Sequence, residues 1–197
     1  LLNESHGLLR RTKARVMMSV LSENKGELTT FPALDLFDKL GVSPAREDIN
    51  RVVEHARYNP SATGSVTFTS QNVAAVLGLL DGIYGDRNIS DYEVDHIFPS
   101  SRADEVEEAT GEDIDIHRLG NLQLLHHSVN NSEKDTQWPK DWIGNLSEGE
   151  QRRYQKNNRY PNDVEMIPEN FTEFVEKRED LIEQSLIDRY VSSSSAE

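Results

Sequence analysis

Residues 92–99 read YEVDHIFP and residues 120–125 read GNLQLL, and these two stretches decide the fold. Both are short runs rich in β-branched, aromatic and other apolar residues, and a proline closes the first, so each is predicted to be a strand. Ser128 can then cap a short helix over residues 129–137, which stops before a Trp-Pro pair. The predicted order is strand, long acidic loop, strand, helix.

Apolar residues at helical spacing dominate the rest of the chain. They predict helices over residues 9–21, 34–40, 44–56 and 71–84, with one strand at 65–69, and a long helix from Pro168 to Val191. The fold class is therefore α+β and mainly helical. We expect a helical region at 1–90, a small strand-strand-helix core at 91–138 and a C-terminal helical region at 139–197 that packs on the core.

Asp95 and His96 stand at the end of the first predicted strand. Hydrolysis of a phosphodiester needs a base to activate water and a cation to neutralise charge on the phosphate. With an ordinary pKa of about 6.5, His96 is a largely neutral base at cellular pH. Asp95 offers a carboxylate oxygen and Asn130, on the following helix, an amide oxygen. So few protein ligands suit Mg²⁺, which keeps several waters, better than zinc.

Adjacent residues of a regular strand point to opposite faces of the sheet. Asp95 and His96 can therefore serve one site only if the strand twists or ends beside them, and Pro99 favours such an end.

Three sequence blocks resemble the HNH motif of the ββα-metal nucleases. They are DHIFP at 95–99, LGNLQLL at 119–125, and Asn130 nine residues after Asn121. The His-x-x-Pro form, and the pair His117-Arg118 before the second block, resemble in particular a nuclease domain found at the C terminus of two groups of proteins. These are GmrSD-type modification-dependent restriction proteins and phosphorothioation-dependent phage-defence nucleases. The motif covers residues 92–136.

The resemblance implies a role for each motif residue. Asp95 and Asn130 would be metal ligands, His96 the general base, and Asn121 the residue that holds His96 in orientation. It also implies a ββα-metal core and a DNA endonuclease that uses Mg²⁺ or Mn²⁺. Two-strand cutting would need two sites, so a monomer would nick one strand at a time. The partners would be DNA and an N-terminal sensor or nucleotide-hydrolysing domain of the same longer protein.

The chain departs from the family pattern at the helix that follows the second strand. The lysine usual three residues after the last asparagine falls at Glu133, with Lys134 one residue later. Asn131 is an alternative metal ligand if the helix starts late. Lys134, Arg118 and His117 are candidate phosphate contacts, and Lys134 lies four residues after Asn130 and so on the same helix face.

Charge is distributed unevenly along the chain. The formal net charge is −14; residues 91–116 carry ten acidic residues against Arg102 alone, while 117–160 carry seven basic against five acidic. Since Lys and Arg supply most nonspecific DNA affinity, we expect weak DNA binding with little sequence preference. The acidic residues 104–115 are predicted to be a solvated loop.

The composition limits the kind of chemistry and the cellular compartment that are expected. There are no cysteines, which excludes disulfides and thiol nucleophiles and favours a reducing cytoplasm. No apolar run approaches the roughly 20 residues that span a bilayer, so no membrane is expected. The first residue is Leu, which suggests the C-terminal piece of a longer protein or the removal of a tag.

An alternative function belongs to a different class of protein. The chain could keep the nuclease fold without catalysis and act as an acidic protein-binding module or a DNA mimic. The nuclease interpretation is favoured because Asp95, His96, Asn121 and Asn130 are all present. A site that had decayed would be expected to have lost at least one of them.

Overall fold

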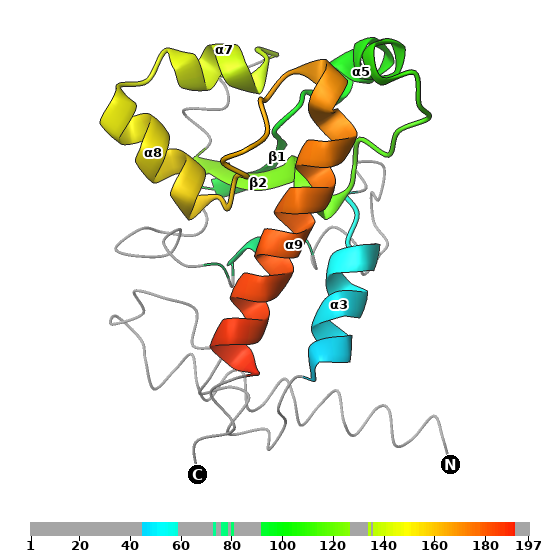
Figure 1. Cartoon of the computed structure of the whole chain (residues 1–197), viewed down its shortest axis with the longest axis vertical. Coiled ribbons are helices and arrows are strands. Elements are labelled where there is room, and N and C mark those ends of the chain that lie inside the picture. The colour runs from blue at the N-terminus through cyan, green and yellow to red at the C-terminus, as the bar shows by residue number, and fades with distance from the viewer. Residues whose placement is uncertain are drawn as a thin grey trace.

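The computed structural model describes residues 45–58, 73, 76–78, 80, 92–126, 134 and 136–191 (Figure 1). Its elements in chain order are α3 (Arg46–His55), β1 (Tyr92–His96), η2 (Ser100–Arg102), α5 (Ala103–Thr110), η3 (Leu119–Asn121), β2 (Leu122–His126), α7 (Pro139–Gly144), α8 (Glu148–Asn157), η5 (Pro168–Asn170) and α9 (Phe171–Tyr190). This confirms the mainly helical α+β class. The helices expected at 9–21 and 34–40, the strand at 65–69 and the start of the helix at 129–137 lie outside the described residues.

The two strands form one antiparallel hairpin sheet in which Asp95 is opposite Gln123 and His96 is opposite Leu122. Directly opposite residues share a face, and successive residues alternate between faces. Asp95 and Gln123 therefore lie on one face of the sheet and His96 and Leu122 on the other. β1 ends at His96, and the start of the second predicted strand, Gly120-Asn121, belongs to the 3-10 turn η3 instead.

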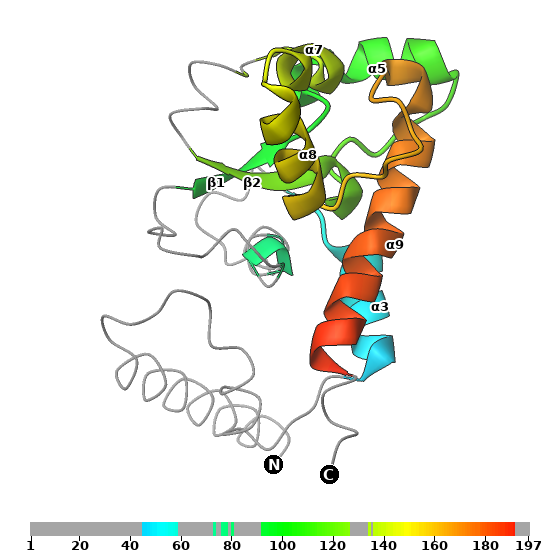
Figure 2. The same ribbon diagram turned by 60° about the vertical axis from the view of Figure 1, so that its left-hand side comes forward.

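Helix α9 joins two hydrophobic clusters. Its C-terminal half packs with α3 and with Leu119, Leu122 and Leu124 in the first cluster. Its N-terminal half packs with residues after β1, from α5 and from α7 in the second cluster. Figures 1 and 2 show α3 beside the C-terminal half of α9, with α5 and α7 toward its N-terminal end. The hairpin is thus held against the middle of one long helix.

The acidic segment is not the loop that composition predicts over residues 104–110. It forms α5, which ends at Gly111, where a φ of 72° is a left-handed conformation that glycine adopts readily. Val106 is fully buried in the second cluster, and the acidic first turn suits the positive end of the helix dipole. A single buried valine anchors the helix, which is too weak a periodic signal to read from sequence.

The other predicted elements are largely confirmed. The helix expected over 44–56 is α3, where the Asp48 carboxylate accepts a hydrogen bond from the Ala45 amide at 3.1 Å. The helix expected from Pro168 to Val191 is η5 followed by α9. Of the helices that the structure describes, none is long and apolar enough to cross a membrane.

Candidate active site

Two donors contact the carboxylate of Asp95, and both contact the same oxygen. Its Oδ2 accepts a hydrogen bond from Gln123 Nε2 at 2.9 Å and lies 2.9 Å from Lys134 Nζ. Within the described part of the chain, no hydrogen bond or ion pair reaches Oδ1. Among the described contacts, one oxygen of Asp95 is therefore engaged by two donors and the other by none.

Lys134 is buried beside this carboxylate. Its side chain is 2% exposed, and its ammonium also donates to the backbone carbonyl of His96 at 2.6 Å. A buried ammonium needs such partners to offset the loss of hydration. Lys134 thus links the side chain of Asp95 with the backbone of His96. Its predicted contact with a phosphate stays a prediction.

Gln123 connects Asp95 to two tyrosines. Its side chain is fully buried, and its Oε1 accepts hydrogen bonds from Tyr160 Oη at 2.8 Å and from Tyr154 Oη. Burial raises the pKa of both tyrosines, so both hydroxyls remain protonated donors. None of these three residues is predicted from the sequence to belong to the site.

His96 is a buried base. It is 9% exposed, its Nε2 lies 3.0 Å from His117 Nδ1, and the Tyr58 ring meets it edge-on at 5.4 Å. Burial, and then the charges of His117 and Lys134, lower its pKa to about 4. His96 is therefore neutral at cellular pH, the form that can accept a proton.

The segment after α3 holds His117 in place. The Tyr58 amide donates to the His117 carbonyl at 3.1 Å, and the His117 amide donates to Asp115 Oδ1 at 3.1 Å. Arg57 Nε pairs with Asp115 Oδ2 at 2.5 Å. The contact between the two imidazoles is thus supported by an element far from both in sequence.

Asn121 fixes the loop that leaves β1. It is fully buried; its Oδ1 accepts from the Phe98 amide at 2.8 Å, and its Nδ2 donates to the carbonyls of Phe98 at 3.0 Å and Ile116 at 2.9 Å. The Ile97 amide also donates to the Asn121 carbonyl at 2.8 Å. Among the described contacts, Asn121 meets the backbone after His96 rather than its ring. Any orienting effect on His96 would act through that backbone.

Helix α9 packs closely against the turn that carries Asn121. A Cβ on Gly120 would overlap the Val175 carbonyl and lie 2.8 Å from Val175 Cγ1, so only glycine allows this approach of turn and helix. Glu179 accepts from the Gly120 amide at 3.0 Å and pairs with Arg118 at 2.5 Å. The predicted phosphate contact by Arg118 therefore competes with this pairing.

Arg178 also joins α9 to this turn, from inside the core. It is fully buried and donates to four carbonyls: Leu119 at 3.1 Å, Gly120 at 2.9 Å, Leu122 at 2.7 Å and Asn158 at 2.9 Å. Burial lowers the pKa of its guanidinium to about 10, so the group stays charged at neutral pH.

The structure thus brings together Asp95, His96, His117, Asn121 and Lys134. Asn130 and Asn131 lie outside the described residues. Among the residues that are described, no group of three or more His, Asp or Glu side chains is placed to hold a metal.

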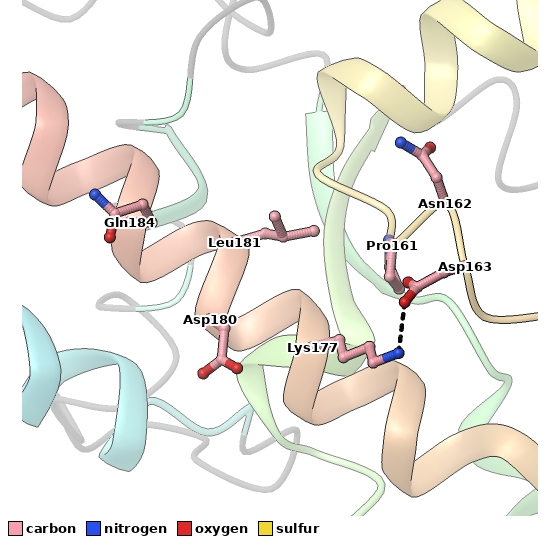
Figure 3. A pocket seen from close by; sticks show the side chains of 7 residues that line it. All are labelled: Pro161, Asn162, Asp163, Lys177, Asp180, Leu181 and Gln184. Carbon is pink, nitrogen blue, oxygen red and sulfur yellow. Dashed lines mark hydrogen bonds and ion pairs between the residues drawn. The ribbon is translucent and has the colours of Figure 1, made fainter.

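A shallow pocket lies elsewhere, between α9 and the segment that follows α8 (Figure 3). It is lined by Pro161, Asn162, Asp163, Lys177, Asp180, Leu181 and Gln184. Lys177 is paired with Asp163 at 2.7 Å and with Glu173 at 2.9 Å. The pocket contains none of the predicted site residues.

The family follows from comparison with known proteins. A family model described as "GmrSD restriction endonucleases, C-terminal domain" matches residues 44–189, which is most of the chain, so the protein belongs to this family. Membership supports a nuclease domain of the restriction-endonuclease type and confirms the GmrSD-type resemblance. The match extends well beyond the motif and includes α3 and most of α9. No curated protein matches the chain.

Proposed function

We propose that this domain is an HNH endonuclease that uses Mg²⁺ or Mn²⁺ to hydrolyse one phosphodiester bond of DNA at a time. The observation that carries the proposal is the buried imidazole of His96 in contact with His117, next in sequence to Asp95, whose Oδ1 is engaged by none of the described residues. A restriction-endonuclease family and these two groups point to the same chemistry.

His96 is the general base. When its Nε2–H donates to His117 Nδ1, the Nδ1 of His96 keeps the lone pair that takes a proton from the attacking water. In that tautomer His117 would hold the ring through this hydrogen bond, and Asn121 holds the backbone just after it. Orientation of the base is thus divided between two residues.

Asp95 Oδ1, together with the amide oxygen of Asn130 or Asn131, would hold the metal ion. Hard oxygen ligands in small number fit Mg²⁺ and Mn²⁺, and such an ion neutralises charge on the phosphate and the leaving oxygen. Asp95 and His96 point to opposite faces of β1, but the strand ends at His96. A phosphodiester at this end would meet both, with Lys134, His117 and Arg118 as candidate phosphate contacts.

The domain would act as the effector of a larger restriction or phage-defence protein in the cytoplasm. Residues 117–160 net only +2 and are flanked by segments of −9 and −7. Nonspecific affinity for DNA should therefore be low, and a sensor or nucleotide-hydrolysing domain would bring the nuclease to its target. Within the chain, residues 91–138 would form the catalytic core, between the helical regions 1–90 and 139–197.

A metal-dependence experiment tests the proposal. Supercoiled plasmid is incubated with the purified chain in Mg²⁺, in Mn²⁺ and in EDTA, with Asp95→Asn in parallel. We expect nicked circles in either metal, none in EDTA, and strongly reduced nicking by the variant. No cutting by the folded wild type in any metal would instead favour the acidic binding module. Equal cutting in EDTA would contradict the metal requirement.

A further inference from the structure

Gln123 has a place that a surface or packing role does not explain. It lies directly opposite Asp95 across the two-stranded sheet, and its side chain is fully buried. Both the nitrogen and the oxygen of its amide nevertheless make hydrogen bonds. Its Nε2 donates to Asp95 Oδ2 at 2.9 Å, and its Oε1 accepts from the hydroxyls of Tyr154 and Tyr160.

The carboxylate fixes which end of the Gln123 amide faces it, and the two hydroxyls stabilise that same orientation. An amide has one accepting end and one donating end. Because the ionised carboxylate can only accept, the nitrogen of Gln123 must point to Asp95, and its oxygen then accepts from the two tyrosine hydroxyls. In the flipped orientation, two N–H groups would meet two hydroxyls and an oxygen would meet a carboxylate.

Ring packing keeps the tyrosines in this arrangement. Tyr154 meets Trp142 edge-on with ring centres 4.9 Å apart, and Tyr160 meets Phe174 in the same way at 5.3 Å. The two tyrosines also contact each other, with ring centres 5.8 Å apart. The hydroxyls that hold the oxygen of the Gln123 amide are therefore carried by packed rings on α8 and on the segment that follows it.

Asp95 is held in turn. Gln123 and Lys134 both engage Oδ2, so rotation of the carboxylate is restricted and Oδ1 keeps a defined direction. We propose that Gln123, oriented by Tyr154 and Tyr160, is a positioning residue that presents Asp95 Oδ1 for metal binding. The inference rests on the proposed function and extends the metal site into the C-terminal helical region.

Removal of the hydroxyls tests this without loss of the rings. Tyr154→Phe, Tyr160→Phe and the double variant are compared with the wild type, and Tyr190→Phe is the control because Tyr190 is a buried tyrosine at the far end of α9. Binding of Mn²⁺ to the full chain is measured by calorimetry or by electron paramagnetic resonance. Loss of partners that orient a metal ligand typically weakens metal binding about 10- to 100-fold.

We expect that range for the double variant, a smaller weakening for each single variant, and wild-type affinity for Tyr190→Phe. Raising the Mn²⁺ concentration should restore plasmid nicking by the double variant, which a general loss of structure would not allow. The single variants keep one hydroxyl on Gln123 and all the ring contacts, so they decide the matter if the double variant does not fold.

The outcomes separate this inference from the proposed function. If the wild type binds Mn²⁺ and nicks DNA while the folded tyrosine variants bind Mn²⁺ equally well, Gln123 is not a positioning residue and the nuclease proposal stands. If the wild type neither binds Mn²⁺ nor nicks DNA, both fail. Equal weakening by Tyr190→Phe would also overturn the inference, because the effect would then not be specific to Gln123.

Discussion

Arg178→Met removes the guanidinium that joins α9 to the turn before β2. Methionine keeps much of the apolar length of the side chain but cannot donate a hydrogen bond. The carbonyls of Leu119, Gly120, Leu122 and Asn158 then lose this partner inside the core. The turn that carries Asn121 should loosen, and the folded state should be less stable.

The size of the effect follows from these four contacts. A buried acceptor left without a partner costs about 1–3 kcal/mol. If neighbours or water satisfy half of the four, the loss is about 2–6 kcal/mol. Relief from burying a charge offsets part of it, so we expect a net loss of about 2–4 kcal/mol. For a chain of this size that corresponds to a decrease in Tm of roughly 5–15 °C.

Thermal unfolding followed by circular dichroism measures this decrease. Lys177→Met is the matched control, since it removes a neighbouring positive charge whose exposed ammonium pairs, among the described residues, with two surface carboxylates. Its Tm should stay close to wild type. Arg178→Lys should not restore stability, because an ammonium cannot reproduce the fork of donors. The reasoning is refuted if Arg178→Met unfolds at the same temperature as Lys177→Met.

Three further predictions concern the site and its support. Asn121→Ala should lower the free energy of unfolding, measured in urea, by about 2–4 kcal/mol, because three buried backbone groups lose their hydrogen-bond partner. The variant should also nick DNA more slowly. Wild-type stability would contradict this prediction. Gly120→Ala should cost about 1–3 kcal/mol or more through overlap with α9, whereas Gly149→Ala, with open space around it, should not destabilise; equal unfolding midpoints would refute the argument. His117→Ala should slow nicking about 10- to 100-fold by freeing the His96 ring, with less effect on folding; an unchanged rate would show that His117 does not orient the base.

The elements visible in the sequence are those with a local pattern. The two strands follow from short apolar runs and α9 from helical spacing, because both signals lie within a few residues. α5 was missed because its pattern rests on Val106 alone. Its many carboxylates suggested a solvated loop.

The support of the site depends on contacts that are distant in sequence. Gln123 meets Tyr154 and Tyr160 across separations of 31 and 37 residues, so neither tyrosine could be assigned to the site from sequence. The contacts of Asn121 likewise depend on the path that the backbone takes after His96, which the sequence alone does not show. Arg178 did leave a signal, because it falls on the buried face of α9 at helical spacing from Val175 and Ile182. A charge in an apolar stripe indicates a buried polar partner.

His96→Ala tests the central claim most directly. The rate of plasmid nicking in Mg²⁺ is compared among wild type, His96→Ala and His55→Ala, a control that removes an exposed imidazole on α3. General base catalysis contributes roughly 10²- to 10⁴-fold, so the rate for His96→Ala should fall by about that factor while His55→Ala cuts like wild type. Folded His96→Ala that nicks plasmid at the wild-type rate would contradict the account.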